Sequence, residues 1–242
     1  MGTAVSLDIP KAEDRAIFET VFKRLRSIDE RFSPYKATSE LCRFQGGEIK
    51  KADLSREMRR IMAACAAAET ETDGYFSAYF DGQFNPTGYV KGWAIAEAGR
   101  LLKANGFKAF CLGIGGDILA ASDGHKTWRI GLQDPRDPRA LIGQLDIKNG
   151  AVATSGIYER GKHIINPKTG QPATELLSLS VTGPDIVKAD VLTTAGLAMG
   201  QAGLAFIARQ KGYQALAIDR RGELSATSDM LKALNHSLEN NR

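Results

Sequence analysis

The sequence predicts an α+β fold, in which helices and antiparallel hairpins are mixed and do not alternate regularly. Apolar residues recur at helical spacing through the first 105 residues and again after residue 188. Between residues 107 and 182 the pattern changes to continuous or alternating apolar runs, with an Asn-Gly hairpin signal. No repeat, linker or low-complexity tract interrupts the chain. Residues 1–242 are therefore expected to form one domain, either as a single unit or as two intimately packed lobes.

Three helices are expected before residue 106, preceded by an edge strand that starts in the N-terminal GTAV segment. The first helix lies within 11–32, where apolar residues follow helical spacing and a serine–proline pair ends the run. Ser55 is a suitable N-cap for the second helix, which should stop near 73–74 at an aspartate–glycine pair. The third should run from about 90 to 105, with Gly106 as its stop signal.

Strands dominate the middle of the chain. Residues 107–112 form a continuous apolar run, and apolar residues alternate with polar ones over 128–132, as in a half-buried strand. The apolar residues at 145–147 precede Asn149-Gly150, so residues 151–154 are expected to return as the hairpin partner of 145–147. A short apolar strand is expected at His163. The remaining elements are a strand, two helices, a strand and a turn: 179–182, 188–199, 203–211, 215–219 and 220–222.

Composition excludes several classes of protein. Hydrophobic residues make up 43% and charged residues 25%, which are ordinary globular values. The net charge of +4 comes without a Lys/Arg-rich run, so no nucleic-acid partner is expected, and no apolar run is long enough to span a bilayer. The cysteines Cys42, Cys65 and Cys111 are far apart and are interpreted as buried thiols in a reducing compartment. The N-terminus lacks a signal-peptide pattern, which predicts a cytoplasmic location for the chain as given; a trimmed exported precursor would have the same sequence.

Two segments carry the most specific chemistry: HIINPKTG at 163–170 and ADVLTTAGLAMG at 189–200. Asp190 and Thr194 are four residues apart, so on a helix a carboxylate and a hydroxyl lie on one face and can reach the same hard cation. An acidic residue near a helix start is, however, more often a cap or a dipole-favoured residue. His163 taken alone is more often explained as a structural histidine bonded to the backbone.

Three glycine-bearing segments add to this picture. NPTGYVKGW at 85–93 places Lys91 where a loop enters a helix, so an ammonium and backbone N–H groups can converge on phosphate oxygens, although the spacing is not that of a P-loop. GIGGDI at 113–118 follows a strand but lacks the third glycine of a dinucleotide loop, which favours a tight strand-end turn. ATSGIYER at 153–160 can be simply the turn that joins two strands.

Taken together and in this order, the segments resemble the FAD:protein FMN transferases, the ApbE family. The resemblance extends over nearly the whole chain, and the order of KGW, GGDI, SGxY, HIIxPxTG and ADxxxT is highly specific. It implies an ApbE-type α+β fold with a T-fold-like core and FAD in a cleft. The residues that it implies in flavin binding are Met1, Tyr35, Tyr75, Phe76, Ser77, Asn85, Lys91, His163 and Ile164. Those that it implies in binding Mg²⁺ are Gly88, Asp190, Thr193 and Thr194.

The activity implied by the resemblance is transfer of FMN from FAD to a threonine or serine hydroxyl of an acceptor flavoprotein, with release of AMP. Tyr35 would cover an aromatic ring face, Lys91 would hold the pyrophosphate, and His163 would deprotonate or orient the hydroxyl. Asp190 completes the catalytic set through the metal. Two alternatives remain: an FAD-binding carrier or sensor without turnover, and a Mg²⁺-dependent hydrolase that converts FAD to FMN and AMP.

The sequence departs from the usual family pattern at five positions. Asparagine or serine replaces aspartate at three of them, and small residues replace Asp and Asn at the other two. Asn keeps an acceptor oxygen but loses the charge of Asp, so these changes are expected to alter FAD affinity and orientation, and activity is expected to survive. The five positions are Ser77, Asn85, Ala96, Gly113 and Asn166.

Overall fold

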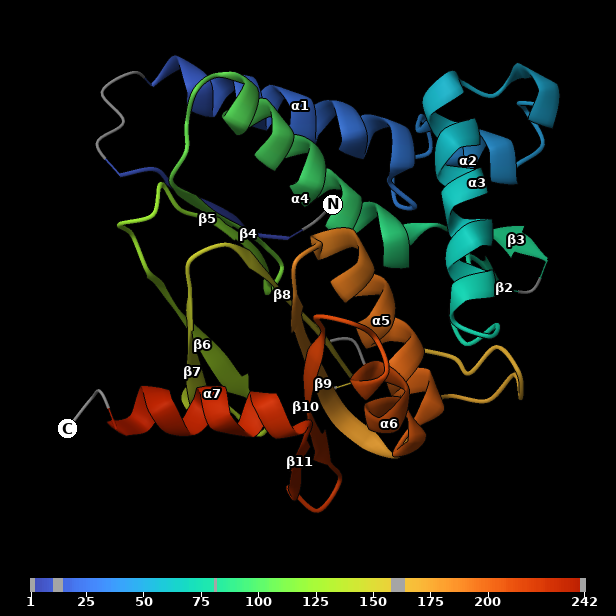
Figure 1. Ribbon diagram of the computed structural model, residues 1–242. Coiled ribbons are helices and arrows are strands. Elements are labelled where there is room, and N and C mark those ends of the chain that lie inside the picture. The colour runs from blue at the N-terminus through green and yellow to red at the C-terminus, as the bar shows by residue number, and fades with distance from the viewer. Residues whose placement is uncertain (1–2, 11–14, 81, 158–163, 240–242) are drawn as a thin grey trace.

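The computed structural model describes residues 3–10, 15–80, 82–157 and 164–239 (Figure 1). The helices are α1 (Ala16–Phe32), α2 (Glu40–Gln45), the 3₁₀ turn η1 (Lys51–Asp53), α3 (Arg56–Glu71), α4 (Thr87–Ala104), α5 (Ile186–Met199), α6 (Ala202–Ala208) and α7 (Ser228–Glu239). The strands are β1 (Val5–Asp8), β2 (Tyr79–Phe80), β3 (Gln83–Phe84), β4 (Phe110–Ile114), β5 (Asp117–Ala121), β6 (Trp128–Asp134), β7 (Asp137–Ile147), β8 (Gly150–Gly156), β9 (Leu176–Gly183), β10 (Gln214–Asp219) and β11 (Leu224–Ala226).

A seven-stranded antiparallel sheet, ordered β1-β4-β5-β8-β9-β10-β11, organises the molecule. Its two faces bury different cores, because successive side chains of a strand point to opposite sides. On β8, Ala151 and Ala153 join the large core under α4 and α5, whereas Val152 joins a smaller core. The β6–β7 hairpin and α7 cover that smaller core (Figure 1). The predicted α+β class is confirmed.

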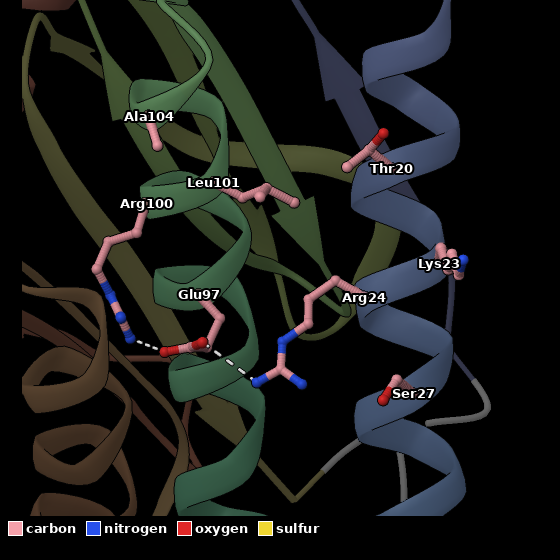
Figure 2. A pocket seen from close by; sticks show the side chains of 8 residues that line it. All are labelled: Thr20, Lys23, Arg24, Ser27, Glu97, Arg100, Leu101 and Ala104. Atoms are coloured by element: carbon pink, nitrogen blue, oxygen red, sulfur yellow. Dashed lines mark hydrogen bonds and ion pairs between the residues drawn. The ribbon is translucent and has the colours of Figure 1, made fainter.

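Helix α1 lies across α4 and adds its buried face to the large core (Figure 1). Its buried residues, Ile17, Val21, Leu25, Ile28 and Phe32, follow the helical spacing seen in the sequence. The two helices flank an open hollow in which Glu97 forms ion pairs with Arg24 and Arg100 (Figure 2). Arg24 also lies over the Trp93 ring, 5.5 Å from its centroid, so this hollow belongs to the α1–α4 contact.

The prediction of a hairpin at Asn149-Gly150 is wrong. Strand β7 pairs with β6, and β8 pairs instead with β5 and β9 in the large sheet. The Asn149 side chain accepts a hydrogen bond from Ser122 N at 2.9 Å, and Gly150 has a φ of 153°. The Asn-Gly pair therefore marks the point where the chain crosses from one sheet to the other. Burial of β8 between two neighbours outweighs the local turn preference.

Most other elements occur near the expected positions. Ser55 caps α3 by accepting from Met58 N at 3.1 Å, and α4 begins at Thr87, three residues earlier than expected. GIGGDI forms the predicted tight turn, between β4 and β5, with Gly115 and Gly116 at φ 55° and 89°. His163 lies outside the described residues. Of the strand expected at this position, the described residues that follow show a single β-bridge, from Ile165 to Pro172.

Two predictions about composition have a structural outcome. Among the described residues, no helix combines the length and the apolar character that crossing a membrane requires. All three cysteines are free thiols, but only Cys65 is buried, while Cys42 and Cys111 are half-buried. Burial and the nearby Glu69 carboxylate raise the pKa of Cys65 to about 12, so this thiol is expected to be unreactive at neutral pH.

Candidate functional site

A cleft of about 660 Å³ opens where the N-terminal half of α4 meets α5 and the end of β8. Nearly all of the described residues implied in flavin or metal binding line it: Tyr35, Tyr75, Phe76, Ser77, Asn85, Gly88, Lys91, Ile164, Asp190 and Thr194. Thr193 is fully buried and does not line the cleft. Met1 and His163 lie outside the described residues. The structure thus brings together residues that are up to 159 positions apart in the sequence.

The floor of the cleft is formed by close packing of α4 on α5. A Cβ atom added at Gly92 would lie 2.9 Å from Asp190 Cβ and 3.0 Å from the Ile186 carbonyl, so any side chain here would force α5 or Asp190 to shift. The contact lets Gly92 N donate a hydrogen bond to Asp190 Oδ2 at 2.8 Å. Helix α5 is capped by Asp185, which accepts from Lys188 N at 2.8 Å. Asp190 therefore does not cap its helix, and its carboxylate is directed towards α4.

Lys91 lies between two buried carboxylates. Its Nζ is 2.5 Å from Asp117 Oδ2 and 3.4 Å from Asp190 Oδ1. Asp117 is fully buried, and Asp190 is 1% exposed, whereas the Lys91 side chain retains 27% exposure towards the cleft. The Asp117 contact is an ion pair, and within the described part of the chain no donor reaches Asp117 Oδ2 with hydrogen-bond geometry. A partly exposed ammonium at this position can meet an anionic ligand in the cleft.

Burial and neighbouring charges raise the pKa values of both Asp117 and Lys91. Burial, followed by repulsion from Asp190, raises the pKa of Asp117 above its usual range, although Lys91 and Thr154 N counteract part of the shift. Burial alone would lower the pKa of Lys91, but the attraction of Asp190 and Asp117 outweighs it and raises that pKa. Lys91 is therefore a permanent cation at physiological pH.

The hydroxyls on α5 differ in what they face. Thr194 donates to the Asp190 carbonyl at 3.2 Å, so its proton is satisfied within the helix and its lone pairs remain available to the cleft. Thr193 donates to the same carbonyl at 2.7 Å and accepts from Ser155 Oγ at 2.9 Å. Thr193 thus connects α5 to β8, and Thr194 is the hydroxyl that faces the cleft.

The oxygen atoms in the cleft fit a Mg²⁺ ion. Among the described residues no three His, Cys, Asp or Glu side chains gather in a metal cluster, so a cation here would depend on one carboxylate with neutral oxygens and water. In a regular helix the N–H of residue 92 lies next to the carbonyl of residue 88, four positions earlier. Because Gly92 N donates to Asp190 Oδ2, the Gly88 carbonyl and the Asp190 carboxylate, two of the implied Mg²⁺ ligands, lie near the same amide. A Cβ added at Gly88 would be 3.8 Å from Thr194 Oγ1, which places these two residues side by side.

A model described as the ApbE family matches residues 1–82 and 80–217, which is most of the chain. The chain belongs to the ApbE family. Among curated relatives, the FAD:protein FMN transferase of Klebsiella pneumoniae (strain 342) is 30% identical over 145 residues, or 55% of this chain and 41% of the relative. The protein of the same name from Rhodobacter capsulatus is 33% identical over 153 residues, or 59% and 29%. The aligned region thus spans less than half the length of these relatives.

Two solved structures share the fold across nearly the whole chain. The ApbE protein of Thermotoga maritima superposes with a TM-score of 0.84 at 22% identity, covering 96% of both chains. The flavin transferase ApbE of Vibrio cholerae gives a TM-score of 0.80 at 20% identity, covering 97% of this chain and 96% of its own. At such identities the comparison establishes the fold, and it confirms the expected ApbE-type architecture.

Aromatic side chains form the rim of this ApbE-family cleft. Tyr35 is 78% exposed, so its ring is accessible to a planar ligand. Tyr79 and Phe80 on β2 are each 51% exposed and line the same cleft, although the sequence did not single them out. Lys168 lies over the Tyr75 ring, 4.3 Å from its centroid, so a cation–π contact connects the loop after residue 163 to Tyr75 in the cleft lining.

Three of the five departures from the family pattern make local hydrogen bonds. Asn166 Nδ2 donates to the Ala198 carbonyl at 3.0 Å, near the C-terminus of α5, and its Oδ1 accepts from Lys168 N. An aspartate could not make the first contact, because an ionised carboxylate donates no hydrogen bond. Asn85 Oδ1 accepts from Thr87 N at 3.2 Å at the start of α4. Ser77 Oγ accepts from Tyr79 N at 3.1 Å.

Besides Tyr79 and Phe80, the residue that sequence reasoning missed is Asp117. It belongs to the GIGGDI segment, which predicts a turn, and the turn is present. The sequence did offer a signal: Asp117 is a charged residue that comes directly after a continuous apolar strand and two glycines. A carboxylate buried at such a position requires a cationic or hydrogen-bonding partner. That partner, Lys91, lies 26 positions earlier on α4, so the pair cannot be identified from local spacing.

Proposed function

We propose that this ApbE-family chain is an FAD:protein FMN transferase. It moves FMN from FAD to a threonine or serine hydroxyl of an acceptor flavoprotein, depends on Mg²⁺ and releases AMP. The observation that carries the proposal is the Lys91 ammonium, held between Asp117 and Asp190 at the floor of a cleft with an aromatic rim. The names of the curated relatives support the transfer of FMN from FAD to a protein.

Binding of FAD follows from the two chemistries of the cleft. Its aromatic rim, which includes Tyr35, offers a face for the flavin ring. The pyrophosphate then lies nearest the floor, where Lys91 attracts its oxygens. Asp190, Thr194 and the Gly88 carbonyl would hold Mg²⁺, which when bound neutralises charge on the pyrophosphate and polarises its phosphorus.

The transfer step exchanges one P–O bond for another. The acceptor hydroxyl oxygen forms a bond to the FMN-side phosphorus, and the bond from that phosphorus to the bridging oxygen breaks, so AMP leaves with that oxygen. Lys91 stabilises the charge that accumulates on the leaving phosphate. We assign His163, which lies outside the described residues, to take up or orient the hydroxyl proton.

The proposal is tested by resolving the products of one reaction. The protein is incubated with FAD and Mg²⁺, with and without an acceptor flavoprotein, and AMP, free FMN and protein-bound flavin are separated. We expect bound flavin and AMP in equal amounts only when the acceptor is present. Free FMN with AMP in both reactions would instead establish a hydrolase, and bound FAD without AMP would establish a carrier.

A matched pair of variants on α4 sharpens the result. Lys91→Met removes the ammonium at the cleft floor, and we expect it to abolish AMP release. Lys103→Met removes an ammonium from the last turn of the same helix and should behave like the wild type. Equal activity of both variants would contradict the role given to Lys91.

A further inference from the structure

Asp117 is a fully buried carboxylate that the proposed reaction does not use. It begins β5, directly after the Gly115–Gly116 turn, and lies outside the set of side chains that line the cleft. Burying a carboxylate is unfavourable unless it is paired, so a neutral residue would be expected here if the position served packing alone. The single cation that contacts Asp117 among the described ion pairs is Lys91.

The two carboxylates around Lys91 are held in equivalent ways but at different distances. A backbone amide anchors one oxygen of each: Thr154 N donates to Asp117 Oδ1 at 3.0 Å, and Gly92 N donates to Asp190 Oδ2 at 2.8 Å. The other oxygen of each faces Lys91 Nζ, at 2.5 Å for Asp117 and 3.4 Å for Asp190. One ammonium is thus shared unequally by two carboxylates, and it lies closer to Asp117 than to Asp190.

We propose that Asp117 is a positioning residue that holds Lys91 away from Asp190 and so preserves the negative charge of Asp190 for a divalent cation. Of these two carboxylates, Asp190 lines the cleft, whereas Asp117 is fully buried and is not part of the lining. Without Asp117, the Lys91 ammonium moves to Asp190 Oδ1, because this is the nearest remaining anion in the cluster. Lys91 then competes with the cation for one oxygen. The inference rests on the Mg²⁺ dependence of the proposed function.

The test is calorimetric titration of Mg²⁺ into the full chain without FAD, so that the readout is metal binding alone. Asp117→Asn keeps the size of the side chain and the oxygen that accepts from Thr154 N. We expect this variant to bind Mg²⁺ on the order of tenfold more weakly than the wild type, since Lys91 now neutralises Asp190. Asp146→Asn, which alters an ion pair on β7, should leave the affinity unchanged.

The decisive measurement is the double variant. Lys91→Met removes the competitor, so we expect Asp117→Asn/Lys91→Met to recover at least the wild-type Mg²⁺ affinity. Persistently weak binding in the double variant would overturn the inference, because it would mean that Asp117 is itself a ligand or only supports the fold. Wild-type Mg²⁺ affinity in Asp117→Asn alone, or no Mg²⁺ binding by the wild type, would also overturn it. Flavin transfer by the wild type, assayed in parallel, reports separately on the proposed function.

Discussion

Replacing Gly92 by alanine tests whether the cleft depends on the close approach of α4 and α5. The new Cβ would lie 2.9 Å from Asp190 Cβ, 3.0 Å from the Ile186 carbonyl and 3.1 Å from Asp190 Oδ2. Two of these neighbours belong to the carboxylate residue and one to the α5 backbone, so the strain is relieved only if the helices separate or Asp190 rotates. Either movement lengthens the 2.8 Å hydrogen bond from Gly92 N.

The expected magnitude combines two opposing terms. Overpacking of this kind costs about 1–3 kcal/mol, and alanine recovers about 1 kcal/mol over glycine inside a helix. We therefore expect a net loss of stability of about 0–2 kcal/mol, measured by urea unfolding. Mg²⁺ binding should fall much more steeply than stability, because the ligand itself is displaced.

Gly99→Ala is the matched control on the same helix. Its Cβ would meet Leu119 Cδ2 at 2.5 Å, the end of a flexible side chain that can rotate away, and it is remote from Asp190. We expect this variant to retain Mg²⁺ and FAD binding. If Gly92→Ala bound Mg²⁺ as the wild type does, the close contact would not be what positions Asp190.

Three further predictions follow from individual contacts. Asp190→Ala should abolish Mg²⁺ binding in calorimetry, whereas Thr194→Ala should weaken it less because water can replace a hydroxyl; the reverse order would contradict the assignment. Asn166→Asp should lower the melting temperature by an amount equivalent to about 1–3 kcal/mol, because it faces the Ala198 carbonyl with a negative charge, and an unchanged value would refute the role of this contact. Burial opposes ionisation of Glu57, but hydrogen bonds from two arginines outweigh it and lower its pKa below 4.5. Its stabilising charge is therefore present above that pH and lost as the pH falls through the folded-state pKa. Glu57→Gln should reduce the acid sensitivity of the melting temperature below pH 4.5, and an identical acid limb would contradict this.

The elements that could be predicted from the sequence are those determined by local patterns. The helical spacing of Ile17 to Phe32 and the Ser55 cap both identify elements that the structure contains. Helix α2 was missed because six residues are too few to show a period, although Ser39 caps it. The hairpin at Asn149-Gly150 failed because strand partners are chosen by burial across the whole sheet.

In the candidate site too, residues in local motifs could be predicted from the sequence, whereas contacts between distant segments could not. Lys91, Asp190 and Thr194 were identified through motifs, and the structure places all three around one cleft. The different orientations of Thr193 and Thr194 depend on the exact rotation of α5, which a spacing argument does not determine. Asp117 is recognised only once β5 and α4 are seen to meet, because its role lies in a contact between distant segments.

The fate of each phosphorus of FAD tests the proposed transfer most directly. FAD labelled at the FMN-side phosphorus is incubated with the protein, Mg²⁺ and an acceptor flavoprotein, and the experiment is repeated with label at the AMP-side phosphorus. We predict that the first label is recovered on a threonine or serine of the acceptor and the second entirely in AMP. Recovery of the AMP-side label on the acceptor, or of the FMN-side label only in free FMN, would contradict FMN transfer by this cleft.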